Sequence, residues 1–215
     1  MIAEGVQRWQ CWCVFAERGT GMKKDDRFYW DMQRYIAVTT IGPSTLRNQG
    51  ASGVIKAAQK YLAVVDLAEF NAEKEEEFLS ALDVQTDRLR AALPSGAQHW
   101  GAARKALNVF LRDVCYNRFL CEKHGLASLE DWMEIPLDGL VAQALKRKAG
   151  RGRLPRWPGI SELTPDVSGP FQAFARRIAA SMGISRMRLW VEEREGNSAS
   201  GGRANEVGTS ARFEL

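Results

Sequence analysis

The sequence predicts an all-α protein, and three observations support that prediction. Apolar residues recur at intervals of three and four along most of the chain, as they do on the buried face of a helix. Strand patterning is weak, since only 35–41 is enriched in β-branched residues, and that segment could equally end a helix. A chain of 215 residues, 45% of them apolar, can also bury a sizeable core, in one domain or in two apposed lobes.

The first expected helices lie before residue 122. Apolar residues form a core-facing stripe over 53–67. The next helix, 71–93, is acidic at its start and basic at its end, as the helix dipole favours. The sequence Pro94-Ser95-Gly96 ends that helix, and a third helical pattern runs from residue 100 or 101 to about 121.

The second half of the chain is expected to hold shorter helices around an irregular crossing. Asp138 lies at or near a helix N-terminus, in a helix that runs to about residue 148. The proline-containing segment 150–169 has no helical pattern. Further helices are expected from Ser128 and over 170–181 and 185–195, and a Gly/Ser/Asn-rich tail follows at 196–215, which we expect to be flexible.

Composition excludes several classes of protein. The longest apolar runs span about five residues, against the roughly 20 that a membrane span needs. The first eight residues resemble no signal peptide, so we expect a protein of the cytoplasm. We also expect it to be a monomer. With two histidines and no Cys-x-x-Cys pair, we expect neither a disulfide framework, nor a metal site, nor another cofactor. The cysteines that we expect to act as packing residues are Cys11, Cys13, Cys115 and Cys121.

A basic segment, 146–156, is a candidate surface for nucleic acid. It holds six cations and no acid, although the whole chain carries a net charge of only +4. Lysine and arginine placed on a phosphate backbone release counterions, which drives binding. The alternative is a solvated helix end stabilised by its own dipole. We expect Trp157 to touch base or backbone, and the cations assigned to DNA are Lys146, Arg147, Lys148, Arg151 and Arg153.

Lys105 and Asp138, 33 residues apart, form a candidate catalytic pair. A lysine amine is a nucleophile once it is desolvated enough to lose its proton. A neighbouring carboxylate can take protons or stabilise a developing cation. Two helix starts that face one cleft would bring the two groups together, with backbone amides holding the carboxylate. On spacing alone, a solvated lysine on a polar helix face explains the pattern equally well.

Three motifs resemble segments of the helix-hairpin-helix DNA glycosylases, the family of endonuclease III. The segment GAARKALNVFL at 101–111 resembles the family's G-x-G-R-K-T-A-N-V-V-L. The segment IPLD at 135–138 resembles the one that holds the essential aspartate. The segment LRNQG at 46–50 is similar to L-S-x-Q-A, whose glutamine fills the gap left by the extruded base. The motifs occur in the family's order within about half of the chain, 41–145.

The departures from endonuclease III point to particular branches of the family. The hairpin at 93–101 is longer than L-P-G-V-G, the interval between lysine and aspartate is longer, and the four-cysteine iron–sulfur motif is absent. Gly139-Leu140 stand where threonine and histidine are frequent. These features resemble the archaeal 8-oxoguanine glycosylases. The chain also looks similar to a bacterial branch with a phage-defence enzyme that excises α-glucosylated hydroxymethylcytosine.

The resemblance implies a base-flipping enzyme of two helical lobes with a DNA cleft between them. Gln49 would fill the void, Lys105 would attack C1′ to form a Schiff base that can proceed to strand scission, and Asp138 would deprotonate Lys105 or stabilise the sugar cation. The substrate would be an oxidised purine such as 8-oxoguanine, in DNA repair, or a phage hypermodified cytosine, in antiviral defence. Residues in or beside the matching motifs that we assign to DNA binding are Arg47, Asn48 and Arg104.

We expect one two-lobed domain over 1–195. One lobe would cover about 45–140 with its hairpin at 94–105, and the N-terminal and C-terminal helices would form the other. Two other classes remain open. A non-catalytic helix-hairpin-helix module would bind phosphates through the same fold but would have no use for Asp138. A protein-interaction bundle would instead use the acidic residues 73–77 as its working surface.

Overall fold

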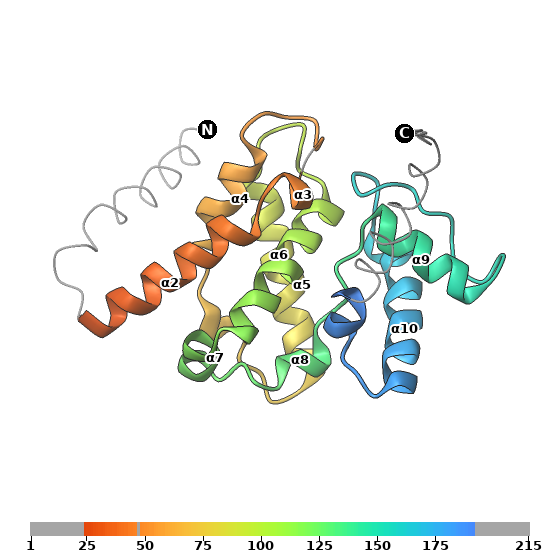
Figure 1. The fold of residues 1–215 in the computed structure, drawn as a ribbon. Coiled ribbons are helices and arrows are strands. Elements are labelled where there is room, and N and C mark those ends of the chain that lie inside the picture. Colours follow the sequence, from red (N-terminus) through yellow and green to blue (C-terminus); the bar gives the residue numbers. More distant parts are fainter. Residues whose placement is uncertain (1–23, 47, 192–215) are drawn as a thin grey trace, which may run out of the picture.

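The structure, a computed structural model, describes residues 24–46 and 48–191. As predicted, every regular element in this part of the chain is a helix (Figure 1). Residues 186–191 are also helical, and the expected tail at 196–215 lies outside the described residues. The elements are α2 (Lys24–Thr40), α3 (Pro43–Leu46), α4 (Val54–Leu62), the 3-10 helix η1 (Leu67–Phe70), α5 (Glu75–Ala92), α6 (Trp100–Tyr116), α7 (Arg118–His124), α8 (Leu129–Trp132), α9 (Gly139–Ala149) and α10 (Pro165–Met182).

Some helix boundaries differ from the predicted ones for local reasons. The third helix stops at Tyr116 because Asn117 is extended and its side chain caps α7, accepting a hydrogen bond from Leu120 N at 3.1 Å. Helix α10 starts five residues earlier than predicted, because Thr164 caps it and Pro165 occupies its first turn. The ambiguous segment 35–41 belongs to the end of α2 up to Thr40.

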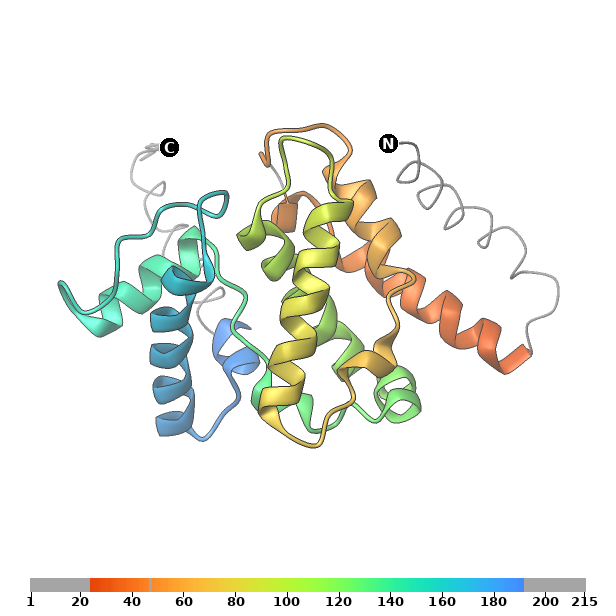
Figure 2. The same ribbon diagram turned by 180° about the vertical axis from the view of Figure 1, so that it is seen from behind.

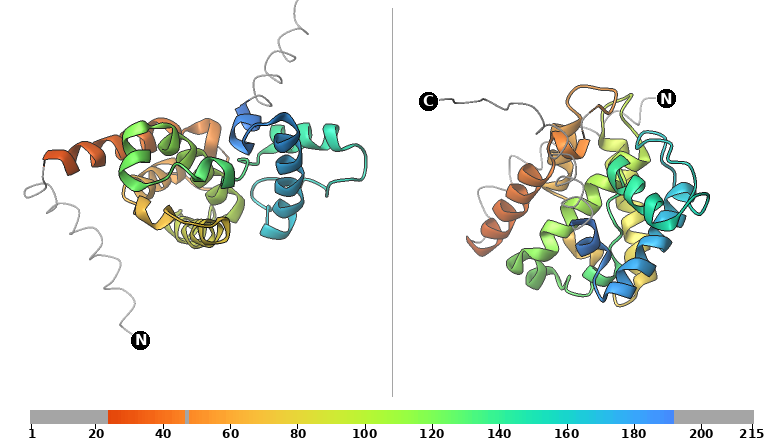
Figure 3. Two further views of the ribbon diagram at one scale, coloured as in Figure 1. Left: turned by 90° about the horizontal axis from the view of Figure 1, so that it is seen from below. Right: turned by 45° about the vertical axis from the view of Figure 1, so that its right-hand side comes forward.

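Two clusters of buried apolar side chains organise the helices. The larger cluster draws on α2 to α8, on η1 and on Met187, and the smaller one draws mainly on α9, α10, Leu189 and Trp190. Figures 2 and 3 show the two groups of helices side by side from other directions. The N-terminal region was expected to join the C-terminal helices. Instead α2 packs against α4 and α6, because its buried residues Ile36 and Ala37 belong to the larger cluster.

Helix α6 lies between the two clusters. All its residues from Gly101 to Leu111 are buried. Phe110 and Leu111 pack in the larger cluster, whereas Val109 belongs to the smaller one. A polar side chain on a helix enclosed in this way is costly without a partner, since little water reaches it.

Two close backbone approaches join elements that are distant in sequence. Gly50, at φ 87°, lies against the hairpin between α5 and α6, so that a Cβ on it would come 2.6 Å from the Gly96 carbonyl oxygen. The turn after α3 and the hairpin therefore lie side by side, at the upper end of the larger group in Figure 1. Gly101 lies against the crossing between α9 and α10, where a Cβ would meet the Ile160 carbonyl oxygen and come 2.7 Å from Leu163 Cβ.

Two further observations concern the cysteines and the apolar character of the helices. Cys115 and Cys121 are free thiols packed against the larger cluster, and burial raises the pKa of Cys115 to about 12. Cys11 and Cys13 lie outside the described residues. No helix within residues 24–46 and 48–191 combines the length and the apolar character that crossing a membrane requires.

Replacing Gly101 with alanine tests the close approach between α6 and the crossing. The added methyl would displace backbone at Ile160, so we expect Gly101→Ala to lower the free energy of unfolding by about 1–3 kcal/mol in urea titrations. Gly169→Ala is the matched control, because Gly169 is an exposed position inside α10 with nothing within 4 Å of an added Cβ. It should change the free energy of unfolding by no more than about 0.5 kcal/mol, because the helix propensity gained by alanine is offset by the crowding of its Cβ against Pro170. Equal effects of the two substitutions would contradict the close approach.

Candidate functional site

Lys105 lies in the second turn of α6 and is buried, with 5% of its surface exposed. Its Nζ is 3.2 Å from Asp138 Oδ2, and it donates a hydrogen bond to the Ser44 carbonyl oxygen of α3 at 3.3 Å. A buried ammonium is costly without a compensating charge, and the Asp138 carboxylate supplies one. The structure therefore brings together the two residues that the sequence analysis paired.

Asp138 is held by the start of α9. It is the N-cap residue, and its Oδ1 accepts hydrogen bonds from the backbone N–H groups of Leu140 and Val141, each at 3.0 Å. The positive end of the helix dipole favours a negative charge at this place. One carboxylate oxygen is thus fixed by the helix, and the other faces Lys105. The expectation that backbone amides hold this carboxylate is confirmed.

A small cavity adjoins Lys105. Its volume is about 10 Å³, room for roughly one water molecule. A nucleobase does not fit into it in this conformation. The lining residues come from α6, the segment before α9, the crossing and α10: Gly101, Arg104, Lys105, Asn108, Ile135, Leu137, Leu163, Ser168 and Gln172.

Trp157 lies beside the start of α9. Its Nε1 would be 3.8 Å from a Cβ on Gly139, the residue that follows Asp138. The indole packs edge-on against Phe171 of α10, with ring centroids 5.9 Å apart. It is half-buried in the smaller cluster, so part of its surface remains exposed.

The glutamine motif lies next to the hairpin. Asn48 is exposed and adopts a left-handed conformation, with φ 58°. Gln49 is only 6% exposed and does not project into solvent. The contact between Gly50 and Gly96 holds this turn against the hairpin. Arg47 lies outside the described residues.

Arg104 occupies a different environment from the one expected of a DNA contact. It is 6% exposed, and its guanidinium forms two hydrogen bonds with Glu134, at 2.7 and 3.0 Å. It also donates to Asp83 at 2.8 Å and to Thr86 at 3.1 Å. Burial opposes the charge, but the two carboxylates outweigh it and raise the pKa of Arg104 above its ordinary value. The geometry favours a role inside the protein over the DNA contact that we expected.

The basic segment lies at the other end of α9 from Asp138. Lys146, Arg147 and Lys148 form the last turn of this helix, about 15 Å from its start. The glycines at 150 and 152 have positive φ angles and turn the chain there. Arg147, Lys148 and the two arginines that follow are exposed, whereas Lys146 is half-buried. The two arginines that follow α9 are Arg151 and Arg153. Helix α9 therefore has Asp138 at its N-terminus and the basic segment at its C-terminus.

Sequence reasoning missed the polar partners around Arg104. Glu134 stands in the apolar run Met133-Glu134-Ile135, where a buried acid was a signal for a buried cation. Asn108 also donates to Glu134, at 3.3 Å, because it follows Arg104 by one helical turn on the same face of α6. Gln172 of α10 bonds both backbone groups of Ile135, each at 2.9 Å, and nothing in the sequence pointed to it.

Removing the cap of α9 should be measurable as lost stability. We expect Asp138→Ala to lower the free energy of unfolding relative to Asp138→Asn by about 0.5–2 kcal/mol, because asparagine retains an oxygen for the two backbone N–H groups. Both variants lose the charge opposite Lys105, so their difference in urea denaturation isolates the cap. Identical unfolding midpoints would show that the cap does not hold Asp138.

In comparisons with known proteins, no family model, no curated protein and no solved structure matches this chain.

Proposed function

We propose that this chain is a DNA glycosylase that extrudes a modified base, cleaves its N-glycosidic bond and acts as a monomer. The observation that carries the proposal is the buried lysine–aspartate pair: Lys105 Nζ lies 3.2 Å from a carboxylate whose other oxygen is fixed by the start of α9. A protein that only binds phosphates has no need to bury a lysine against a capped aspartate, because cations for phosphate contact work best when exposed.

The pair supports base removal by a lysine nucleophile. The Lys105 ammonium gives a proton to Asp138, and the free amine bonds to C1′ as the bond from C1′ to the base breaks. The base leaves with the electrons of that bond. In the alternative route Asp138 stays ionised, and its carboxylate stabilises the positive charge that develops on the sugar, which is the larger part of the expected rate enhancement. In the lysine route, the nitrogen then gives a proton to the departing base, and its lone pair expels O4′ from C1′, with O4′ taking the proton held by Asp138. The resulting Schiff base can undergo β-elimination, in which C2′ loses a proton and the 3′ phosphate leaves, and this gives lyase activity.

The same proposal gives DNA a path across the protein. The turn of Asn48 and Gln49 lies against the hairpin at one end of the larger group, and α9 lies in the neighbouring group (Figure 1). We infer a cleft for DNA between these groups, with Gln49 moving out of its buried position to fill the space of the flipped base. Trp157 borders the start of α9 and supplies an aromatic surface there.

The proposed substrate is a modified base in double-stranded DNA. The two candidates are an oxidised purine such as 8-oxoguanine, which makes the protein a repair enzyme, and a hypermodified phage base such as α-glucosyl-hydroxymethylcytosine, which makes it a defence enzyme. The cavity next to Lys105 is far smaller than either base, so the site must open for both. Release assays on DNA of each kind decide between them.

Covalent trapping tests the catalytic assignment. The purified chain is incubated with duplexes containing 8-oxoguanine, uracil or an abasic site, and with glucosylated phage DNA, in the presence of borohydride. We expect an adduct with the wild-type chain and none with Lys105→Gln, which should still bind DNA because the buried amine contributes little to phosphate contact. Asp138→Asn should release base more slowly, by about 100-fold or more, while binding changes little.

The matched control is Lys74→Gln, which removes an exposed lysine at the start of α5. It should trap as the wild-type chain does. Free base without an adduct would indicate a monofunctional enzyme that depends on Asp138. Neither adduct nor release on any substrate would instead favour the non-catalytic DNA-binding module.

The dependence of DNA affinity on salt tests the basic segment. Replacing Lys146, Arg151 and Arg153 with glutamine should weaken binding to all sequences, and should flatten the slope of log K against log salt by about 0.9 for each cation that contacts a phosphate. Arg27→Gln with Arg118→Gln is the control, since these exposed arginines lie on α2 and α7. An unchanged slope in the triple variant would remove this segment from the DNA interface.

A further inference from the structure

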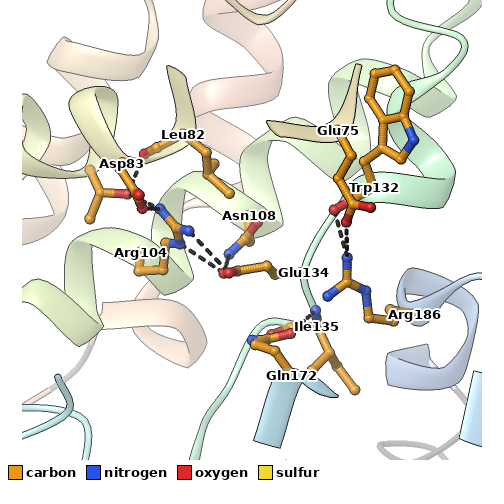
Figure 4. A network of polar contacts seen from close by, with 11 residues as sticks. Glu75, Leu82, Asp83, Arg104, Asn108, Trp132, Glu134, Ile135, Gln172 and Arg186 are labelled. Atoms are coloured by element: carbon orange, nitrogen blue, oxygen red, sulfur yellow. Dashed lines mark hydrogen bonds and ion pairs between the residues drawn. The ribbon is translucent and has the colours of Figure 1, made fainter. Parts of the chain in front are cut away.

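The extended segment Met133–Asp138 (the linker) connects α8 to α9 and delivers Asp138 to Lys105. Its residues 133–137 are buried. Figure 4 shows that neighbouring helices hold it through polar contacts. The Glu134 carboxylate accepts two hydrogen bonds from Arg104. The backbone N–H and C=O of Ile135 pair with the side-chain amide of Gln172.

The anchors of the linker sit next to the lysine. Arg104 precedes Lys105 in α6, and Asn108, which also bonds Glu134, follows it by three residues. Three residues separate Glu134 from Asp138. A displacement of the linker at Glu134 is therefore transmitted over a short, extended peptide to the carboxylate that faces Lys105.

Stability alone does not account for this ion pair. Desolvating an arginine and a carboxylate costs about as much as their attraction returns, and apolar residues of similar volume often pack equally well. What a two-bond contact between guanidinium and carboxylate adds is a fixed distance and a fixed orientation. Glu134 is 9% exposed and Arg104 6%, so water offers little competition for either group.

Asp83 provides an internal contrast. It also accepts a hydrogen bond from Arg104, at 2.8 Å, but it belongs to α5, and its side chain is 66% exposed. Loss of the Asp83 carboxylate removes one of the two negative charges beside Arg104 but leaves the contacts of the linker in place. A substitution at Asp83 changes the charge near Arg104, whereas one at Glu134 also changes the position of the linker, so the two effects can be separated.

We propose that Glu134 is a positioning residue for the lysine–aspartate pair: clamped by Arg104, and with Gln172 holding Ile135, it sets where Asp138 lies relative to Lys105. This inference rests on the proposed glycosylase function for its catalytic meaning. Its structural content, the control of the Lys105–Asp138 contact from Glu134, can be measured without any substrate.

The substrate-free measurement uses nuclear magnetic resonance of the full chain labelled with ¹⁵N-lysine. The Nζ signal of Lys105 is assigned by its absence in Lys105→Gln. The titration midpoint of this signal in Asp138→Asn is the reference value for a Lys105 that has lost its partner carboxylate. Glu134→Asp keeps the charge but shortens the side chain by one methylene, so it should move the midpoint toward the Asp138→Asn value. Asp83→Asn should leave the midpoint near that of the wild-type chain, because the linker stays in place.

The kinetic measurement uses single-turnover base release from the substrate found by trapping. Glu134→Asp should lower the release rate by about 10- to 100-fold, as expected for a displacement of about 1 Å between reacting groups, with the dissociation constant for DNA nearly unchanged. Asp83→Asn should retain the wild-type rate. Gln172→Leu, which removes both bonds to Ile135 without changing any charge, should act like Glu134→Asp.

The outcomes separate the two proposals. If the Lys105 midpoint stays at its wild-type value in a folded Glu134→Asp variant, the positioning role of Glu134 is overturned, whatever Gln172→Leu or the enzyme does. If the midpoint moves as expected but the wild-type chain releases no base from any substrate, the positioning role stands and the glycosylase function falls. Unfolding midpoints are measured for each variant, and should Glu134→Asp fail to fold, Gln172→Leu carries the test with Asp83→Asn as its control.

Discussion

The burial of α6 is the constraint on which the rest of the structure depends. This helix lies between the two apolar clusters and yet carries three polar side chains, Arg104, Lys105 and Asn108, along its enclosed part. Each would cost several kcal/mol if left without a partner. Glu134 and Asp138 supply acceptors for both cations and for the Asn108 side-chain N–H from one short segment of the chain, whereas the buried Asn108 Oδ1 has no hydrogen-bond partner among the described residues. The path of the chain between α8 and α9 is therefore governed by the polar groups of α6 as well as by apolar packing.

The parts of this arrangement that were predictable from sequence are the ones encoded locally. The three- and four-residue spacing predicted helices because burial of one face needs only that spacing. Asp138 could be placed at a helix start because an N-cap is a property of the few residues around it. The pairing of Lys105 with Asp138 came from motifs of a known family, and the distance between Nζ and Oδ2 agrees with it.

The parts that were missed depend on contacts between distant segments. Arg104 reads as one more cation beside Lys105, and only the packing of α5 against α6 and the course of the linker reveal that it faces Asp83 and Glu134. The side of the molecule that α2 joins is likewise decided by its contacts with α4 and α6. Local signals can also compete: Pro170 suggested a helix start, but the Thr164 cap and Pro165 provided an earlier one.

Helix geometry explains why an arginine and a lysine that are adjacent in sequence take different roles. Successive residues of an α-helix point about 100° apart, whereas residues four apart share a face. Arg104 and Asn108 therefore converge on Glu134, while Lys105 points away from them toward Ser44 and Asp138. The linker runs from the first of these faces to the second. The linker is held at Glu134 by hydrogen bonds and at Asp138 by the helix cap, so one short buried segment joins the buried ion pair to the candidate catalytic pair.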